Sequence, residues 1–226
     1  MSRTVVNFVL VLAALGICHA EVVDRMVAVV NRHVILQSEL EQAAHVEFLL
    51  QGRGLDQLTS GEMQAVLDRM IDQALIEQQI GEALLLDPTL GEVSARLSEV
   101  RSQIPGAEAD GKWRAMLISY GVTQEDVEKQ LASQLRILRF VDLRFRSLAH
   151  VDRASISNYY QEKLLPELRK QGAPEPPLEK VADRIENILT EQRIDELLTS
   201  WLQTLRSQTH IQKLNASPSP DAGATQ

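Results

Sequence analysis

The side chains that could do acid–base, nucleophilic or metal chemistry are scattered along this chain. The one cysteine, Cys18, lies near the amino terminus, and the later histidines are far apart and outside motifs such as H-E-x-x-H. The sequence also has no Gly-rich phosphate loop and no Gly-x-Ser-x-Gly nucleophile elbow. We therefore predict no catalytic residue, no bound metal and no cofactor, and interpret the chain as a non-enzyme. The histidines in question are His33, His45, His150 and His210.

Charged residues have structural explanations. The acidic pairs Glu39/Glu41 and Glu125/Asp126 stand where helices are expected to begin, and carboxylates there interact favourably with the helix dipole. A basic stretch on one predicted helix is interpreted as a solvated face with ion pairs to nearby acids. The alternative is a contact surface for an acidic polypeptide or for lipid headgroups. Because the whole chain carries a net charge of −8, nucleic acid is an unsuitable partner. The basic residues are Arg136, Arg139, Arg144 and Arg146.

Methionines and aromatic residues form a candidate peptide-binding set: Met63, Met70, Trp113, Met116 and Tyr120. A surface that accepts many apolar sequences benefits from flexible, polarizable Met side chains and from aromatic faces. Methionines at helical spacing are also common in hydrophobic cores, so packing inside the protein is the alternative interpretation.

The first twenty residues have the pattern of a secretory signal peptide. Arg3 precedes an apolar run from Val5 to Ile17, and small Ala20 stands before Glu21. We expect cleavage after Ala20 and release into the periplasm. A lipoprotein signal with Cys18 lipidated and an uncleaved anchor are the alternatives. Cleavage would leave a mature chain without cysteine, and hence without a disulfide or a thiolate nucleophile.

The mature chain is predicted to be mainly α-helical with a small antiparallel sheet. β-Branched residues in 22–37 flank Asn31-Arg32, which predicts a hairpin with a two-residue turn. Helical apolar spacing then begins repeatedly after a hydroxyl residue that is followed three positions later by an acid, as in a capping box. These pairs are Ser38/Glu41, Thr59/Glu62, Thr89/Glu92 and Thr123/Asp126.

The second half of the chain predicts two further helices and a strand. Asp152 can cap a helix that reaches Leu165, Gln171–Pro177 is rich in proline, and a long helix follows from Leu178. The alternating residues 209–214 predict a strand. Because a lone hairpin is marginal in water, we expect this strand to pair with the 22–37 hairpin. Residues 215–226, rich in Pro, Ser, Ala and Gly, are predicted to be a disordered tail.

The opening of the mature chain resembles that of SurA-type periplasmic chaperones. The similarity lies in Val22–Asn31, Val34-Ile35-Leu36 and Ser38-Glu39-Leu40. It continues to about Tyr160 and resumes from about Pro177 to Leu214. The resemblance implies a chaperone domain over 21–214, made of an amino-terminal part 21–160, a linker 161–177 and a carboxyl-terminal helix and strand 178–214.

The family's parvulin-type isomerase domains are the main departure from this pattern. They usually lie between the Tyr-Tyr helix and the last helix, where this chain has only a short segment, too short for an independent domain of about 90 residues. What remains resembles the chaperone core. It implies an ATP-independent holdase that binds unfolded polypeptides, such as outer-membrane protein precursors, in an apolar groove between the amino-terminal helices and the last helix. The alternatives are an isomerase-related foldase and a scaffold for one dedicated envelope partner.

Overall fold

The structure, a computed structural model, describes residues 24–81 and 84–214. It begins with the predicted hairpin, in which β1 (Met26–Val30) pairs antiparallel with β2 (His33–Leu36). Asn31 takes a positive φ of 57° in the turn between them, as expected because asparagine tolerates this conformation better than most non-glycine residues. The predicted signal peptide and carboxyl-terminal tail lie outside the described residues.

The far end of the chain completes the sheet. Strand β3 (Ile211–Lys213) pairs antiparallel with β1, so the strand order is β2-β1-β3. Two flanking bonds fix the register, because Asn31 N–H donates to His210 (2.9 Å) and Leu214 N–H donates to Val27 (2.9 Å). The predicted mainly helical fold with a sheet shared by both ends of the mature chain is confirmed.

Side-chain caps start most of the long helices at the predicted residues. The hydroxyls of Thr59, Thr89 and Thr123 each accept a hydrogen bond from the backbone three residues on. The prediction for Ser38 is wrong. Strand β2 runs directly into the next helix, so Leu36 takes the cap position and Glu39 closes the box by accepting from its N–H (2.9 Å). Ser38 instead donates its hydroxyl proton to Asp24, and this bond lowers the pKa of that carboxyl.

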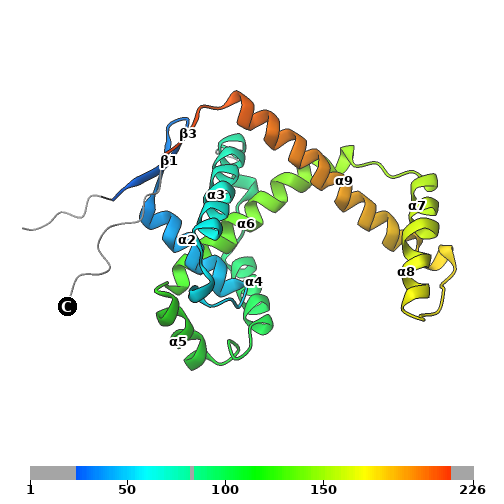
Figure 1. Ribbon diagram of the computed structural model, residues 1–226, viewed down its shortest axis with the longest axis horizontal. Helices are drawn as coiled ribbons and strands as arrows, with labels where there is room; N and C mark the ends of the chain where they lie inside the picture. Colours follow the sequence, from blue (N-terminus) through cyan, green and yellow to red (C-terminus); the bar gives the residue numbers. More distant parts are fainter. Residues whose placement is uncertain (1–23, 82–83, 215–226) are drawn as a thin grey trace, which may run out of the picture.

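Helices form the rest of the molecule (Figure 1). Helix α3 ends at Ile80, because Gly81 adopts a positive φ of 57° there. Short 3₁₀ turns occupy Leu55–Gln57, Leu84–Leu86 and Arg146–Leu148. The helices are α2 (Gln37–Leu50), α3 (Ser60–Ile80), α4 (Leu90–Gln103), α5 (Asp110–Tyr120), α6 (Gln124–Phe145), α7 (Arg153–Tyr159), α8 (Leu165–Lys170) and α9 (Leu178–Gln208).

Three apolar clusters hold these elements together. One lies between the sheet, α2 and α3, with Val27, Val30 and Ile71 at its centre. A second joins α2, α4, α5 and α6. The third, smaller cluster packs α6 against α9, where Trp201 contacts Phe140 and Phe145 at ring-centroid distances of 5.7 Å. We call β1 to α6 together with β3 the body.

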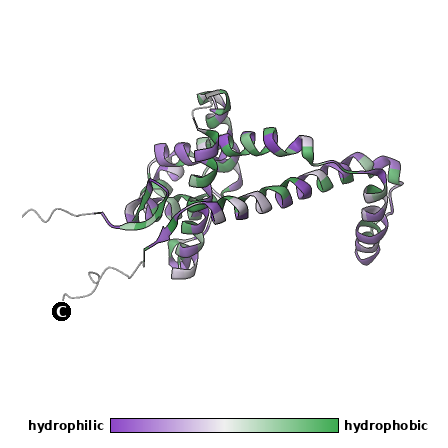
Figure 2. Ribbon diagram, turned by 90° about the horizontal axis from the view of Figure 1, so that it is seen from above, coloured by the Kyte–Doolittle hydropathy of each residue, from purple (hydrophilic) through white to green (hydrophobic). Residues whose placement is uncertain are grey.

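Helix α9 extends from the body to a distal unit, which we define as residues 153–170 (Figures 1 and 2). Its 31 residues span roughly 45 Å at about 1.5 Å each. In the distal unit α7 continues through a π-helical turn, Tyr160–Leu164, into α8. Pro166 explains the widened turn, because its ring clashes with the carbonyl four residues earlier and it has no N–H to donate. The non-helical connection is confined to 171–177, and the division into parts at 160 and 177 stays a prediction.

Candidate functional site

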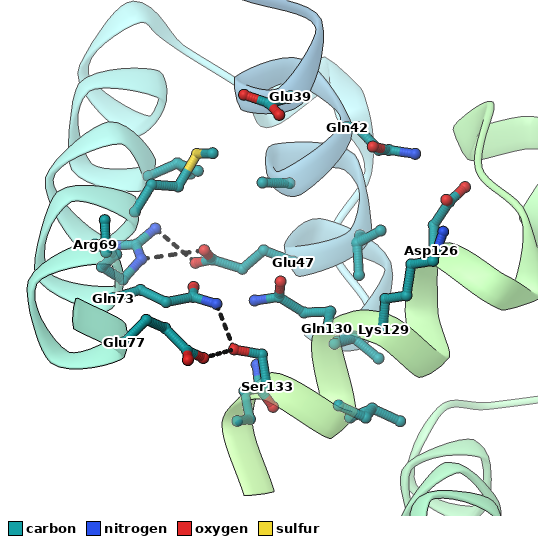
Figure 3. Close-up of a pocket in the computed structure, with 18 of the residues that line it drawn as sticks. Glu39, Gln42, Glu47, Arg69, Gln73, Glu77, Asp126, Lys129, Gln130 and Ser133 are labelled. Carbon is teal, nitrogen blue, oxygen red and sulfur yellow. Dashed lines mark hydrogen bonds and ion pairs between the residues drawn. The ribbon is translucent and has the colours of Figure 1, made fainter. Parts of the chain in front are cut away.

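A cleft of about 1020 Å³ opens on the body (Figure 3). Its walls are α2, α3 and α6, with contributions from β2 and α4, and no residue of α9 lines it. Each of the three wall helices presents one face, because the lining positions recur at steps of three and four residues. On α3 they are Val66, Arg69, Met70, Gln73, Ala74, Glu77 and Gln78, and on α6 they are Asp126, Lys129, Gln130, Leu131, Ser133 and Gln134.

Charged groups facing the cleft are paired with one another. Glu47 of α2 accepts from the Arg69 guanidinium at 2.6 and 3.1 Å, so this pair bridges α2 and α3 (Figure 3). Glu77 accepts from the Ser133 hydroxyl at 2.9 Å and lies 3.0 Å from the Arg136 guanidinium, so it bridges α3 and α6. Since the carboxylates are neutralised across the helices, the cleft does not concentrate charge of one sign.

Acids at the rim are helix caps. Glu39 closes the start of α2, and Asp126 closes the start of α6 by accepting from the Thr123 hydroxyl and N–H. The hydrogen bond from that hydroxyl is the main cause that lowers the pKa of Asp126 below its ordinary value of 3.8. A carboxylate held ionised in this way is a poor proton donor at neutral pH. Within the described residues, moreover, no group of three or more His, Cys, Asp or Glu could hold a metal ion.

The structure distributes the predicted peptide-binding residues over two places. Trp113, Met116 and Tyr120 lie on α5 against the cluster of α2, α4 and α6, where Trp113 is only 3% exposed. The Tyr120 hydroxyl donates to the Arg53 carbonyl at 2.6 Å, which ties α5 to the end of α2. None of these three lines the cleft, so their positions favour packing.

Met63 and Met70 both pack, partly buried, against the cluster beneath the sheet. Of all the predicted residues, only Met70 also lines the cleft. A role for this set in binding stays a prediction, and the structure supplies a different set of candidates. The polar residues of the cleft were not singled out from the sequence, although Gln130 and Gln134 share a face with Asp126 at helical spacing.

The predicted ion pairs of the basic stretch on α6 are confirmed for three of its arginines. Arg136 pairs with Glu77 and with Asp87 at 3.0 Å each, and Arg139 pairs with Glu92. Arg146 pairs with Glu191 of α9 at 2.8 Å. Arg144 differs, because its guanidinium lies 4.8 Å from the ring centre of Trp201 in the contact between α6 and α9. These arginines hold helices and loops together.

No helix in the described part of the chain is both long and apolar enough to cross a membrane.

The cleft lies elsewhere than the groove expected from the sequence. The predicted apolar groove between the amino-terminal helices and the last helix stays a prediction. The cleft described above lies within the body and mixes apolar with amide and paired charged side chains. The reason is that α9 leaves the body after its contacts with α3 and α6 and continues to the distal unit.

Comparisons with known proteins agree with the sequence resemblance. Chaperone SurA of Pseudomonas putida is 31% identical over 153 residues, which cover 66% of this chain and 35% of that protein. Chaperone SurA of Pseudomonas fluorescens is 27% identical over 147 residues, which cover 63% of this chain and 33% of that protein. The chain thus spans about a third of the length of these relatives, and no protein-family profile matches it. These similarities relate the chain to the SurA-type chaperones.

Proposed function

We propose that this protein is a chaperone that holds unfolded polypeptide segments in the cleft of the body without using ATP. The observation that carries the proposal is the cleft itself. Three helices present interleaved apolar and hydrogen-bonding side chains around about 1020 Å³, in a chain related to proteins named Chaperone SurA. Such a lining can accept a chain segment, which carries both kinds of group.

Affinity in such a site should be modest. Burial of a client's apolar side chains against the partly buried Leu50, Met70 and Ala74 contributes about 25 cal/mol per Å² removed from water. Ordering an unfolded segment costs part of that gain, so we expect dissociation constants around the micromolar range. Weak binding suits a chaperone without an energy source, because the client must leave when it folds. The net charge of −8 helps keep complexes soluble.

The amino-terminal pattern supports export, so we propose the periplasm as the compartment. From the resemblance to SurA-type chaperones we also propose outer-membrane protein precursors as clients. Cell fractionation and amino-terminal sequencing of the exported protein test the first part, with Glu21 as the expected first residue. A lipidated Cys18 at the amino terminus would contradict it and favour the lipoprotein alternative.

Suppression of aggregation tests the proposed activity. The purified protein, without nucleotide, should reduce light scattering by several unrelated unfolded clients, outer-membrane precursors among them. Action on a single client would instead favour a dedicated scaffold. A measurable rate in a protease-coupled prolyl isomerisation assay would favour the foldase alternative.

A matched pair of variants tests whether the activity lies in the cleft. Gln130 is partly buried in the cleft wall, whereas Gln192 is exposed on α9. Gln130→Trp should lower the holding capacity several-fold because the indole obstructs part of the cleft, and Gln192→Trp should leave it unchanged. Equal unfolding midpoints for both variants would show that the body is intact. Equal capacities would show that clients bind elsewhere.

A further inference from the structure

Glutamine is the commonest residue type in the cleft wall, and some of these glutamines are already engaged. Gln73 donates to the Ser133 hydroxyl at 2.7 Å, and Gln51 donates to Glu47 at 2.9 Å. Three others, Gln103, Gln130 and Gln134, make no side-chain hydrogen bond to another described residue. Figure 3 shows the Gln130 amide directed into the cleft between Glu47 and Lys129.

The charged groups nearby offer little to a ligand. Arg69 is paired with Glu47, Lys129 lies 2.8 Å from Glu125, and Arg96 lies 2.7 Å from Glu99. A phosphate or carboxylate ligand would have to break one of these pairs. Apart from the His33 imidazole, the hydrogen-bonding groups of the wall that remain available are therefore mainly neutral amides.

A primary amide offers two donors and a carbonyl acceptor, and so complements a peptide group whichever side chain the peptide residue carries. An extended segment of an unfolded chain presents backbone N–H and C=O groups that must find partners when they leave water. The wall offers amides at three places on α4 and α6, and the partly buried apolar side chains of Leu50, Met70 and Ala74 on α2 and α3 line the same cleft.

The size of the cleft suits a short segment. A helix about 10 Å wide rising about 1.5 Å per residue encloses on the order of 120 Å³ per residue. At that volume per residue the cleft of about 1020 Å³ holds roughly eight residues.

We infer that Gln103, Gln130 and Gln134 read the backbone of an extended client segment, so that the cleft selects exposed peptide groups more than any particular side chains. This inference rests on the proposed chaperone function and specifies its substrate as unfolded backbone of mixed sequence. A cleft that reads backbone accepts many clients, and it releases them when folding engages their peptide groups in secondary structure.

Three labelled peptides test the inference by fluorescence anisotropy on the full protein: an eight-residue peptide of mixed sequence, its scrambled version, and a version N-methylated at alternate residues. N-Methylation removes backbone donors and keeps every side chain. We expect the scrambled peptide to bind within twofold of the parent and the N-methylated peptide on the order of tenfold more weakly, as the loss of one to two hydrogen bonds implies. Equal affinities for the parent and N-methylated peptides would overturn the inference.

Substitution of the amides by an apolar side chain of similar size separates amide recognition from apolar recognition. Gln130→Met with Gln134→Met should weaken binding of the parent peptide on the order of tenfold and reduce its advantage over the N-methylated one, with Gln103 still in place. An apolar site would bind better after this change. Methionine has a helix propensity similar to that of glutamine, so α6 should keep its structure. The exposed pair Gln192→Met with Gln203→Met on α9 is the control.

Failure of the inference can be told from failure of the proposed function. If the Met pair on α6 binds all three peptides as the unsubstituted protein does, amide reading is wrong, while aggregation suppression would still support a chaperone. If the unsubstituted protein binds none of the peptides and suppresses no aggregation, both are wrong.

Discussion

The body and the distal unit are both helical, yet they are stabilised differently. The body buries side chains of the sheet and of α2 to α6 in continuous apolar clusters. In the distal unit, 153–170, no side chain is buried, and its apolar residues are only partly covered. Because buried apolar area supplies most of the free energy of folding, the body should fold cooperatively and the distal unit should open on its own. The cleft therefore lies in the region that we expect to be the more stable of the two.

The largest expected difference comes from two matched isoleucines. Ile71 of α3 is 1% exposed within the body, and Ile185, about two turns into α9, is 2% exposed near the distal unit. Ile71→Ala should lower the free energy of unfolding of the body by about 2–5 kcal/mol, through lost burial and an unfilled cavity. Ile185→Ala should leave the main urea transition nearly unchanged and raise hydrogen exchange in 153–190. A similar loss in the main transition for both would show that the two regions unfold together.

A second, smaller effect should follow from removal of the last strand. Truncation after Gln208 deletes β3 and its flanking residues His210 and Leu214, which bond to Asn31 and Val27 at 2.9 Å each. It also deletes Lys213, which pairs with Asp68. The lost hydrogen bonds should cost the body about 2 kcal/mol. Exchange should rise in β1 and at the end of α9, but not in the distal unit. Truncation after Leu214 is the control, and equal stability of the two truncated proteins would show that β3 contributes nothing.

Helix caps offer a third comparison. The Thr123 hydroxyl caps α6 in the body, and the Asp152 carboxylate caps α7 in the distal unit by accepting from Ser155 at 2.7 Å. Replacement of Thr123 by alanine should cost about 1 kcal/mol, and replacement of Asp152 by alanine should weaken the start of α7. For Thr123→Ala this loss should be seen in the main urea transition. For Asp152→Ala it should be seen only as faster exchange in α7, and a shifted main transition in that variant would contradict the separation.

Much of the fold could be predicted because local rules decide it. Asn31 at a two-residue turn, threonine three residues before an acid, and Gly121 after α5 each set a boundary through their own conformational preferences. Pairing of β3 with the hairpin followed from the need for a third strand. Ser38 was wrongly predicted to be the N-cap of α2. The position of that cap depends on where strand β2 ends, and the residue type of Ser38 does not determine this.

The cleft could be predicted far less well. Helical spacing identifies which residues share a face, but the packing angles of α2, α3 and α6 decide which faces remain apart. Trp113 and Tyr120 are residue types that are common in binding surfaces. In the structure Trp113 is buried in the cluster of α2, α4 and α6, and the Tyr120 hydroxyl donates to the Arg53 carbonyl. The sequence does not distinguish the glutamines of the cleft, because each, taken alone, resembles an ordinary exposed helix residue.

The smallest effect expected concerns pH. Hydrogen bonds from Thr123 lower the pKa of Asp126 in the body, and hydrogen bonds from the Ser155 N–H and hydroxyl lower that of Asp152 in the distal unit. A carboxyl whose pKa is lower in the folded than in the unfolded chain stabilises the fold above the unfolded value, near 3.8, and loses this contribution as the pH falls through the folded value. Stability should therefore change little from pH 7 to about 5 and decrease below about 4.

The two aspartates should differ in where this decrease is seen. Asp126→Asn should reduce the acid sensitivity of the main urea transition slightly, since Glu62, Glu92 and Asp110 of the body also have lowered pKa values. Asp152→Asn should leave that transition unchanged and alter only the pH dependence of hydrogen exchange in α7. Asparagine keeps a side-chain acceptor for the cap and removes the titrating proton, so the comparison isolates charge. If Asp152→Asn alters the acid transition of the body as much as Asp126→Asn does, the distal unit is energetically coupled to the body despite its exposed packing.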